Sequence, residues 1–294
     1  MTGFIAEIGS KLADRWATLL VIPGLLYTAA MATATVLGQQ HALSYAALSR
    51  KLTAWANSPA LRPVGGTVLI LSAILAGSVI VGLVAAAGGR FVEILWTLPG
   101  RHVPARWLAE WRRERSRKAK AIADDDFSTQ AQVIEAIRQA DRICLVEADC
   151  PTWIGDRLRA CRVRIQRAYG LDLTAVWPRL WLIVPDAVRS ELSAARDAFR
   201  AAARLTAWAI LYLILGAWWW PAIPIALIIG ITAVAKGRLA AGNLADLIEA
   251  AVDLHGGELA TQFGVSVPLT SAGGTQLTAL MGKSRWNPAS PLAD

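Results

Sequence analysis

Ionisable side chains are absent from three long stretches of this sequence, and they are scarce in the chain as a whole. Only 18% of the 294 residues are charged, against about 25% in a soluble globular chain. The uncharged stretches are 16–38, 65–89 and 205–235, and each is long enough to cross the roughly 30 Å apolar core of a bilayer as a helix. Ion-coupled transporters and intramembrane hydrolases generally need ionisable groups within their spans, so this absence argues against both classes.

Cysteine and histidine are also rare, with three residues of each type. The cysteines are Cys144, Cys150 and Cys161, an odd number that does not suggest a disulfide framework. The histidines are scattered, and no H-x-x-x-H or C-x-x-C pair occurs. The sequence therefore predicts reduced thiols, no structural zinc site of cysteine and histidine, and no cofactor.

Tryptophan is the abundant aromatic residue, with 13 copies beside four tyrosines and five phenylalanines. Trp218, Trp219 and Trp220 interrupt the last uncharged stretch and are followed by a proline. Tryptophan prefers the headgroup level of a membrane, and proline favours a turn or a helix start. The pattern predicts interfacial anchoring at the tip of a transmembrane hairpin with arms 203–219 and 222–239. A re-entrant hairpin is the alternative, because each arm is short.

Lysine and arginine are distributed unequally among the loops that flank these stretches. The loop 39–64 holds only three basic residues, whereas the segments on the other side hold many more. Both termini and residues 90–202 are therefore predicted to be cytoplasmic. The predicted fold is all-α: a polytopic membrane protein with four transmembrane helices and an inserted cytosolic helical domain. Its divisions are 1–89 (a tail and helices at about 16–38 and 65–89, with the outer loop 39–64), the cytosolic domain 90–202, the transmembrane hairpin 203–239, and a cytosolic helix and flexible tail at 240–294.

Much of the net charge of +8 comes from residues 101–120, which hold eight basic and two acidic side chains. A juxtamembrane helix with this charge is typical of contact with the anionic cytosolic leaflet, and contact with an acidic protein partner is a second interpretation. Nucleic acid is disfavoured as a partner, since no recognition motif or stacking platform accompanies the charge. The predicted contact residues are Arg112, Arg113, Arg115, Arg117, Lys118 and Lys120.

A second basic segment, from Thr152 to Gly170, has the pattern of a capped helix. Its apolar residues recur at helical spacing, Thr152 is a suitable N-cap, and Gly170 is a suitable C-terminal stop. The arginines on its other faces either bind an anionic, phosphorylated ligand or stand in solvent above anionic lipid. They are Arg157, Arg159, Arg162, Arg164 and Arg167.

Three carboxylates follow the last uncharged stretch at positions i, i+3 and i+7 of one predicted helix. Asp246, Glu249 and Asp253 therefore share a face of that helix. Three interpretations are open: a metal site, ion pairs with the arginines of the 152–170 helix, or solvated side chains.

Two long predicted helices connect the membrane to the charged segments. Pro185-Asp186 opens a heptad-like apolar pattern that enters the third uncharged stretch without a glycine or proline. The returning arm continues inward to Leu254, interrupted by Gly237 and Gly242. We expect these extensions to pack on each other or on the remaining cytosolic helices.

Small and hydroxyl-bearing residues line the first two predicted spans. Gly77, Ser78 and Gly82 belong to small-xxx-small steps that permit close helix packing, within one chain or between subunits. Thr28 and Thr35 form a mildly polar line on the first span. Helix packing and pore lining are the two roles that these residues suggest, and a homo-oligomer is expected in either case.

Two segments carry a resemblance to known sequences: Pro151 to Leu158 (PTWIGDRL) and Asp172 to Trp181 (DLTAVWPRLW). They resemble uncharacterised multi-span membrane proteins of high-GC actinobacteria, and the resemblance covers most of the chain. It implies a bacterial plasma membrane as the location, and it implies no activity, cofactor or catalytic residue.

No catalytic constellation accompanies this layout, so the chain is predicted not to be an enzyme. The predicted function is that of a membrane anchor or receptor, which couples a basic cytosolic helical domain to an anionic bilayer and recruits or senses a cytosolic protein partner. The alternative is an oligomeric gated channel or pore-forming membrane effector.

Overall fold

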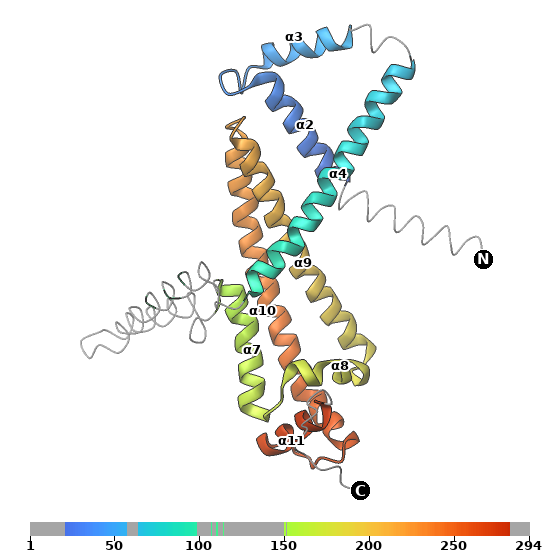
Figure 1. Cartoon of the computed structure of the whole chain (residues 1–294), viewed down its shortest axis with the longest axis vertical. Helices are drawn as coiled ribbons and strands as arrows, with labels where there is room; N and C mark the ends of the chain where they lie inside the picture. Colours follow the sequence, from blue (N-terminus) through green and yellow to red (C-terminus); the bar gives the residue numbers. More distant parts are fainter. Residues whose placement is uncertain are drawn as a thin grey trace, which may run out of the picture. The chain divides into compact units, whose positions relative to one another are not determined.

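The computed structural model describes residues 21–57, 64–98, 107, 110, 114, 150 and 152–282. Every regular element within these residues is an α-helix, which confirms the predicted all-α class (Figure 1). The predicted basic contact residues between Arg112 and Lys120 lie outside the described residues.

Eight helices form the described structure, and they belong to two compact units. The first unit comprises residues 1–93 and 200–236, and the second comprises 94–199 and 237–294. Three long helices contribute residues to both units. In chain order the helices are α2 (Ile22–Leu37), α3 (Tyr45–Ala56), α4 (Val64–Thr97), α7 (Trp153–Tyr169), α8 (Leu173–Ile183), α9 (Asp186–Gly216), α10 (Ala222–Gln262) and α11 (Ser271–Met281).

Three helices are long and apolar enough to cross a membrane: Gly65–Thr97, Asp186–Gly216 and Ala222–Gln262. The predicted first span appears as α2, which is apolar but has only 16 described residues, and residues 16–20 lie outside the described part. One detail of the prediction is wrong: α10 runs unbroken through Gly237 and Gly242. Glycine inside a helix costs about 1 kcal/mol relative to alanine, which the flanking helical sequence tolerates.

The last uncharged stretch forms a helical hairpin, as predicted. Helix α9 ends at Gly216 and α10 begins at Ala222 (Figure 1). The turn is tight, because a Cβ atom on Gly216 would lie 2.6 Å from Cγ1 of Ile223. Trp218 and Trp220 are exposed at this turn, whereas Trp219 is half-buried.

The turn of the hairpin is hydrogen-bonded to the segment that follows α2. The Gln39 amide donates from Nε2 to the Ala217 carbonyl (2.8 Å) and accepts at Oε1 from the Trp220 backbone N–H (3.2 Å). The Trp219 indole Nε1 donates to the Ala42 carbonyl (3.1 Å). Gln39 thus satisfies two backbone groups that the tight turn leaves without helical partners, and the Trp219 indole satisfies one carbonyl of the segment after α2.

An aromatic cluster packs α2 on α9 within the first unit. The Tyr27 ring centroid lies 6.1 Å from that of Trp208 and 5.2 Å from that of Tyr212. The Tyr27 hydroxyl donates to the Leu211 carbonyl at 3.2 Å. Burial of three rings together with a satisfied hydroxyl makes this a specific contact between α2 and the hairpin.

Helices α2 and α4 cross closely where Gly24 faces Ser78. A Cβ atom on Gly24 would lie 2.1 Å from the Ser78 carbonyl oxygen, and Ser78 is fully buried. Gly82 is also buried, whereas a Cβ atom on Gly77 would meet nothing within 4 Å. Of the predicted small-residue steps, the one through Ser78 and Gly82 is therefore a packing face in this chain.

The second unit has its own apolar core, formed by α7, α8, α10 and α11. Leu171, Val176, Leu180, Leu259 and Leu277 are each at most 1% exposed at its centre. Helix α8 forms despite Pro178, which lies within its 11 residues. Burial of its apolar face outweighs the hydrogen bond that a proline inside a helix removes.

Candidate functional site

Helix α7 begins and ends where the sequence predicts. The Thr152 hydroxyl accepts from the Gly155 N–H (3.1 Å) and donates to the Trp96 carbonyl (2.8 Å). Gly170 ends the helix in the left-handed conformation, with φ +67°. The buried Asp156 carboxylate accepts from the Cys150 N–H at 2.8 Å. These bonds hold α7 in one position along its axis, which determines where its arginines point.

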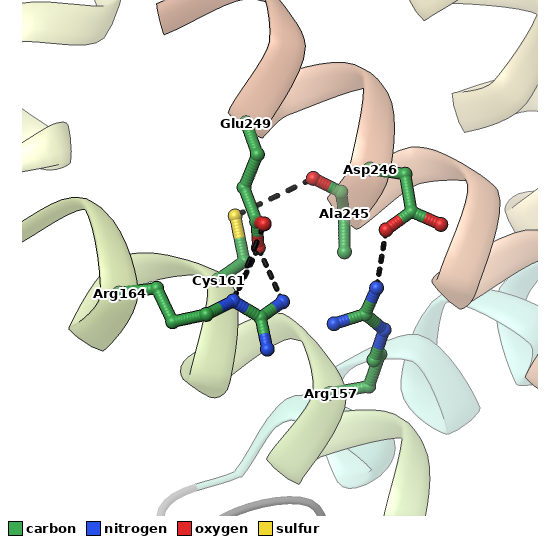
Figure 2. A network of polar contacts seen from close by, with 6 residues as sticks. All are labelled: Arg157, Cys161, Arg164, Ala245, Asp246 and Glu249. Carbon is green, nitrogen blue, oxygen red and sulfur yellow. Dashed lines mark hydrogen bonds and ion pairs between the residues drawn. The ribbon is translucent and has the colours of Figure 1, made fainter. Parts of the chain in front are cut away.

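Helix α7 is joined to α10 by a row of polar contacts, which we call the polar ladder. Arg157 forms an ion pair with Asp246 (Figure 2). Arg164 donates from Nε to both oxygens of Glu249, at 3.1 and 3.2 Å. The Tyr169 hydroxyl donates to Asp253 at 2.9 Å. Residue numbers rise together along both helices, so α7 and α10 run parallel here.

The central pair of the ladder is the best shielded on its acidic side. The Glu249 side chain is 24% exposed and the Arg164 side chain 43%, whereas Asp246 at the next pair is 65% exposed. The hydrogen bond to Glu249 raises the pKa of Arg164, and the hydrogen bond to Asp253 raises the pKa of Tyr169. An ion pair with two guanidinium donors on one carboxylate has a defined orientation, unlike a typical surface pair.

Cys161 lies beneath the ladder and is 1% exposed. Its thiol contacts the Ala245 carbonyl at 3.6 Å (Figure 2). Burial, and to a lesser extent the nearby Glu249 carboxylate, raise the pKa of Cys161 to about 12 against the opposing charges of Arg164 and Arg157. A thiol held in its neutral form is a packing and hydrogen-bonding group and a poor nucleophile or metal ligand.

Alkylation should reveal this protection of Cys161. A pH of 8 is about four units below the pKa of Cys161 in the folded protein, so almost none of this side chain is thiolate. The native protein should therefore react with iodoacetamide far more slowly than the unfolded chain. Mass spectrometry of the peptide containing Cys161, before and after denaturation, measures the difference. Equal labelling of native and unfolded protein would contradict the buried position.

The five predicted arginines of α7 separate into different environments. Arg157 and Arg164 face α10 and bind carboxylates, and Arg159 is half-buried. Arg162 and Arg167 are exposed and have no ion pair with another described residue. An anionic ligand would therefore meet the outer arginines, because the inner two are already neutralised.

The three predicted carboxylates of α10 are brought together with α7. Of the three interpretations, ion pairing is the one observed for Asp246 and Glu249, and Asp253 accepts a hydrogen bond. Within the described ranges, no group of three or more His, Cys, Asp or Glu side chains could hold a metal ion.

The predicted threonine line of α2 bonds to its own helix. Thr28 Oγ1 donates to the Gly24 carbonyl and Thr35 Oγ1 to the Ala32 carbonyl, each at 2.8 Å. Thr28 is half-buried and Thr35 is exposed. Hydroxyls bonded in this way are compatible with a lipid-facing or a packed helix surface.

Two contacts of the second unit were not predicted from the sequence. Tyr169 joins the ladder, and the Arg238 guanidinium lies over the Trp153 ring, 5.6 Å from its centroid. The cation–π contact fixes the start of α7 against α10. Tyr169 is eight residues beyond Cys161, which lies beneath the ladder, and this helical spacing was the one available signal for its face.

Fold and site together define a helical protein with three helices long and apolar enough to span a membrane, and a second helical unit closed by a polar ladder. Comparison of the chain with protein-family models, with curated protein sequences and with solved structures returns no significant match.

Proposed function

We propose that this chain is a non-enzymatic, multi-pass membrane anchor or receptor that recruits or senses a cytosolic protein partner. The proposal rests on one observation: the carboxylates that hold α7 belong to α10, and α10 is the same unbroken helix that begins at the membrane hairpin. A partner that binds the exposed arginines of α7 therefore acts on a helix whose other arginines are paired with α10. Because α10 begins at the hairpin, we expect the effect of binding to reach the membrane.

The proposed topology has four spans, α2, α4 and the two arms of the α9–α10 hairpin, in a bacterial plasma membrane. Both termini and residues 90–202 are cytoplasmic, and the protein is a homo-oligomer in contact with anionic lipid. Exposed apolar side chains on the spans support the bilayer location, among them Leu69, Leu213 and Ile228, which are 72%, 55% and 67% exposed.

The chemistry of the second unit favours binding over catalysis. Cys161, a buried thiol in this unit, retains its proton, and the ladder carboxylates Asp246 and Glu249 are bound to guanidinium groups. General bases and nucleophiles need the opposite arrangement, with an available lone pair near neutral pH.

A capture experiment tests the receptor proposal. Full-length protein in nanodiscs is incubated with cytosol of its host, and bound proteins are quantified by mass spectrometry. At least one protein should be enriched over empty nanodiscs and lost from the Arg162→Glu/Arg167→Glu variant, since both side chains are exposed. The matched control Arg50→Glu/Lys51→Glu on α3 should retain it. The proposal fails if wild-type protein enriches nothing.

The alternative function is an oligomeric gated channel or pore-forming effector. It is favoured by α4, an apolar helix that is largely exposed and presents small residues, as a subunit interface would. Flux of ions from liposomes that contain purified oligomer measures this directly. Absence of conductance in the presence and absence of host cytosol would eliminate the channel.

A further inference from the structure

The charges of the first unit are almost all of one sign. Its described residues contain a single carboxylate, Glu93. The basic residues fall into two groups: Arg50 and Lys51 on α3, and a second group where α4, α9 and α10 leave the uncharged stretches. The second group consists of Arg90, Arg200, Arg204 and Lys236.

Close packing places Arg90 and Arg204 at the same level of the unit. Helix α4 crosses α9 at two adjacent glycines: a Cβ atom on Gly88 would lie 3.1 Å from Ala207 Cβ, and one on Gly89 would lie 2.9 Å from Arg204 Cα. Arg90 is the next residue along α4. Because the two glycines have no side chains, the backbones of α4 and α9 can lie close together next to Arg90 and Arg204.

The hairpin register places Lys236 at this level as well. Gly216 of α9 faces Ile223 of α10, and Gly230 faces Ala209 two helical turns further along. Five residues further along, about one and a half turns, the same register brings Arg204 opposite residue 235, next to Lys236. Ala203 and Ala233, on α9 and α10 near this level, are both buried.

These three cations are available to a ligand. Arg90 and Lys236 are exposed and Arg204 is half-buried. None of the three has a hydrogen bond or ion pair with a described residue, in contrast to Glu93 and Arg200, which are engaged. Three cations held at one level, next to one engaged carboxylate, repel one another and attract an anion.

The surroundings of the three cations indicate which kind of anion they bind. Phe91, beside Arg90, is 67% exposed, and Leu83, two helical turns before Arg90 on the same face of α4, is 49% exposed. Large apolar side chains next to cations suit a ligand with a charged head and an apolar body. A free phosphate would leave these side chains in contact with water.

We propose that Arg90, Arg204 and Lys236 form a binding site for the phosphate headgroup of an anionic phospholipid, with its acyl chains against Phe91 and Leu83. Guanidinium groups bind phosphate oxygens bidentately, and the lysine adds a point charge. The site rests on the proposed membrane location, and it specifies which residues of the first unit select the lipid.

Native mass spectrometry of the full-length protein, purified with equal amounts of phosphatidylglycerol and phosphatidylcholine, tests the site. The wild type should retain phosphatidylglycerol preferentially. The variant Arg90→Gln/Arg204→Gln/Lys236→Gln should retain at least about tenfold less of this lipid, because each cation contributes to the attraction for an anionic headgroup. Arg50→Gln/Lys51→Gln, in the same unit, should match the wild type. Arg90→Lys/Arg204→Lys, which keeps the charge, should retain most of the lipid.

Each other outcome overturns the site. Unchanged retention in the triple variant, or equal retention of both lipids by the wild type, removes the basis for it. Displacement of phosphatidylglycerol by millimolar inorganic phosphate assigns the cations to free phosphate instead. Alkaline carbonate extraction tests the membrane location separately from the lipid site. Release of the wild type from membranes would refute the membrane location, whereas retention of the wild type and all variants supports it whatever the result for the lipid site.

Discussion

Gly274→Ala is expected to displace α11 from α7 and to lower the free energy of unfolding of the second unit by about 3 kcal/mol. A Cβ atom at this position would lie 1.7 Å from the Tyr169 carbonyl oxygen. That oxygen belongs to backbone at the end of α7, so no side-chain rotation can relieve the overlap. One of the two helices has to move.

Movement of α11 opens the core of the second unit. Leu277 and Met281 on α11 are 0% and 3% exposed, and they pack with Leu171. The end of α7 and the start of α11 also approach closely at a second point, since a Cβ atom on Gly170 would lie 2.1 Å from the Ser271 carbonyl oxygen. Any shift that relieves Gly274→Ala therefore exposes apolar surface, at about 25 cal/mol per Å².

Gly242→Ala is the matched control for this substitution. Gly242 is also helical, but a Cβ atom there would meet nothing within 4 Å. This variant should be neutral or more stable by about 0.5–1 kcal/mol, because alanine is the better helix former. Thermal unfolding in detergent and limited proteolysis compare the two. Equal stability of both variants would contradict the close approach of α11 to α7.

Glu249→Arg is expected to destabilise the second unit by about 2 kcal/mol. The substitution removes the carboxylate that Arg164 binds and places a third cation near Arg157, above the buried Cys161. Arg164 is partly exposed, so solvent screening keeps the effect below that of a fully buried pair. Chemical denaturation in detergent, with the wild type as reference, measures it.

Exchanging the two charges should recover part of the loss. In Arg164→Glu/Glu249→Arg the attraction is restored in the opposite direction, and about 1 kcal/mol should return relative to Glu249→Arg alone. Arg162→Glu, an exposed residue of the same helix, should change stability by less than about 0.5 kcal/mol. If the exchange recovers nothing, the pair contributes through packing rather than charge.

Local signals along the chain were sufficient for the bounds of several elements. Thr152 and Gly170 delimit α7, Pro185 precedes α9, and the tryptophans at 218–220 mark the hairpin turn. The signals at Thr152, Gly170 and Pro185 act within about four residues of their own positions, through a cap, a left-handed backbone or a missing N–H. The glycine interruptions predicted for α10 were wrong because packing over 41 residues outweighs two local penalties.

Partners that are distant in the chain were decided by tertiary structure. The five arginines of α7 look alike in the sequence, and only the rotation of α7 against α10 determines that Arg157 and Arg164 face carboxylates more than 80 residues away. Likewise, nothing near Gln39 in the sequence indicates that it binds the hairpin turn.

Composition and local sequence patterns were enough to predict that this protein is helical, that its charge is segregated from three apolar stretches, and where α7 and the hairpin turn lie. These properties follow from composition and from interactions between near neighbours. Tertiary structure alone decided which polar groups meet in the ladder and which cations share one level of the first unit. Those outcomes depend on helix rotation and register, which are set by shape complementarity between surfaces far apart in the chain.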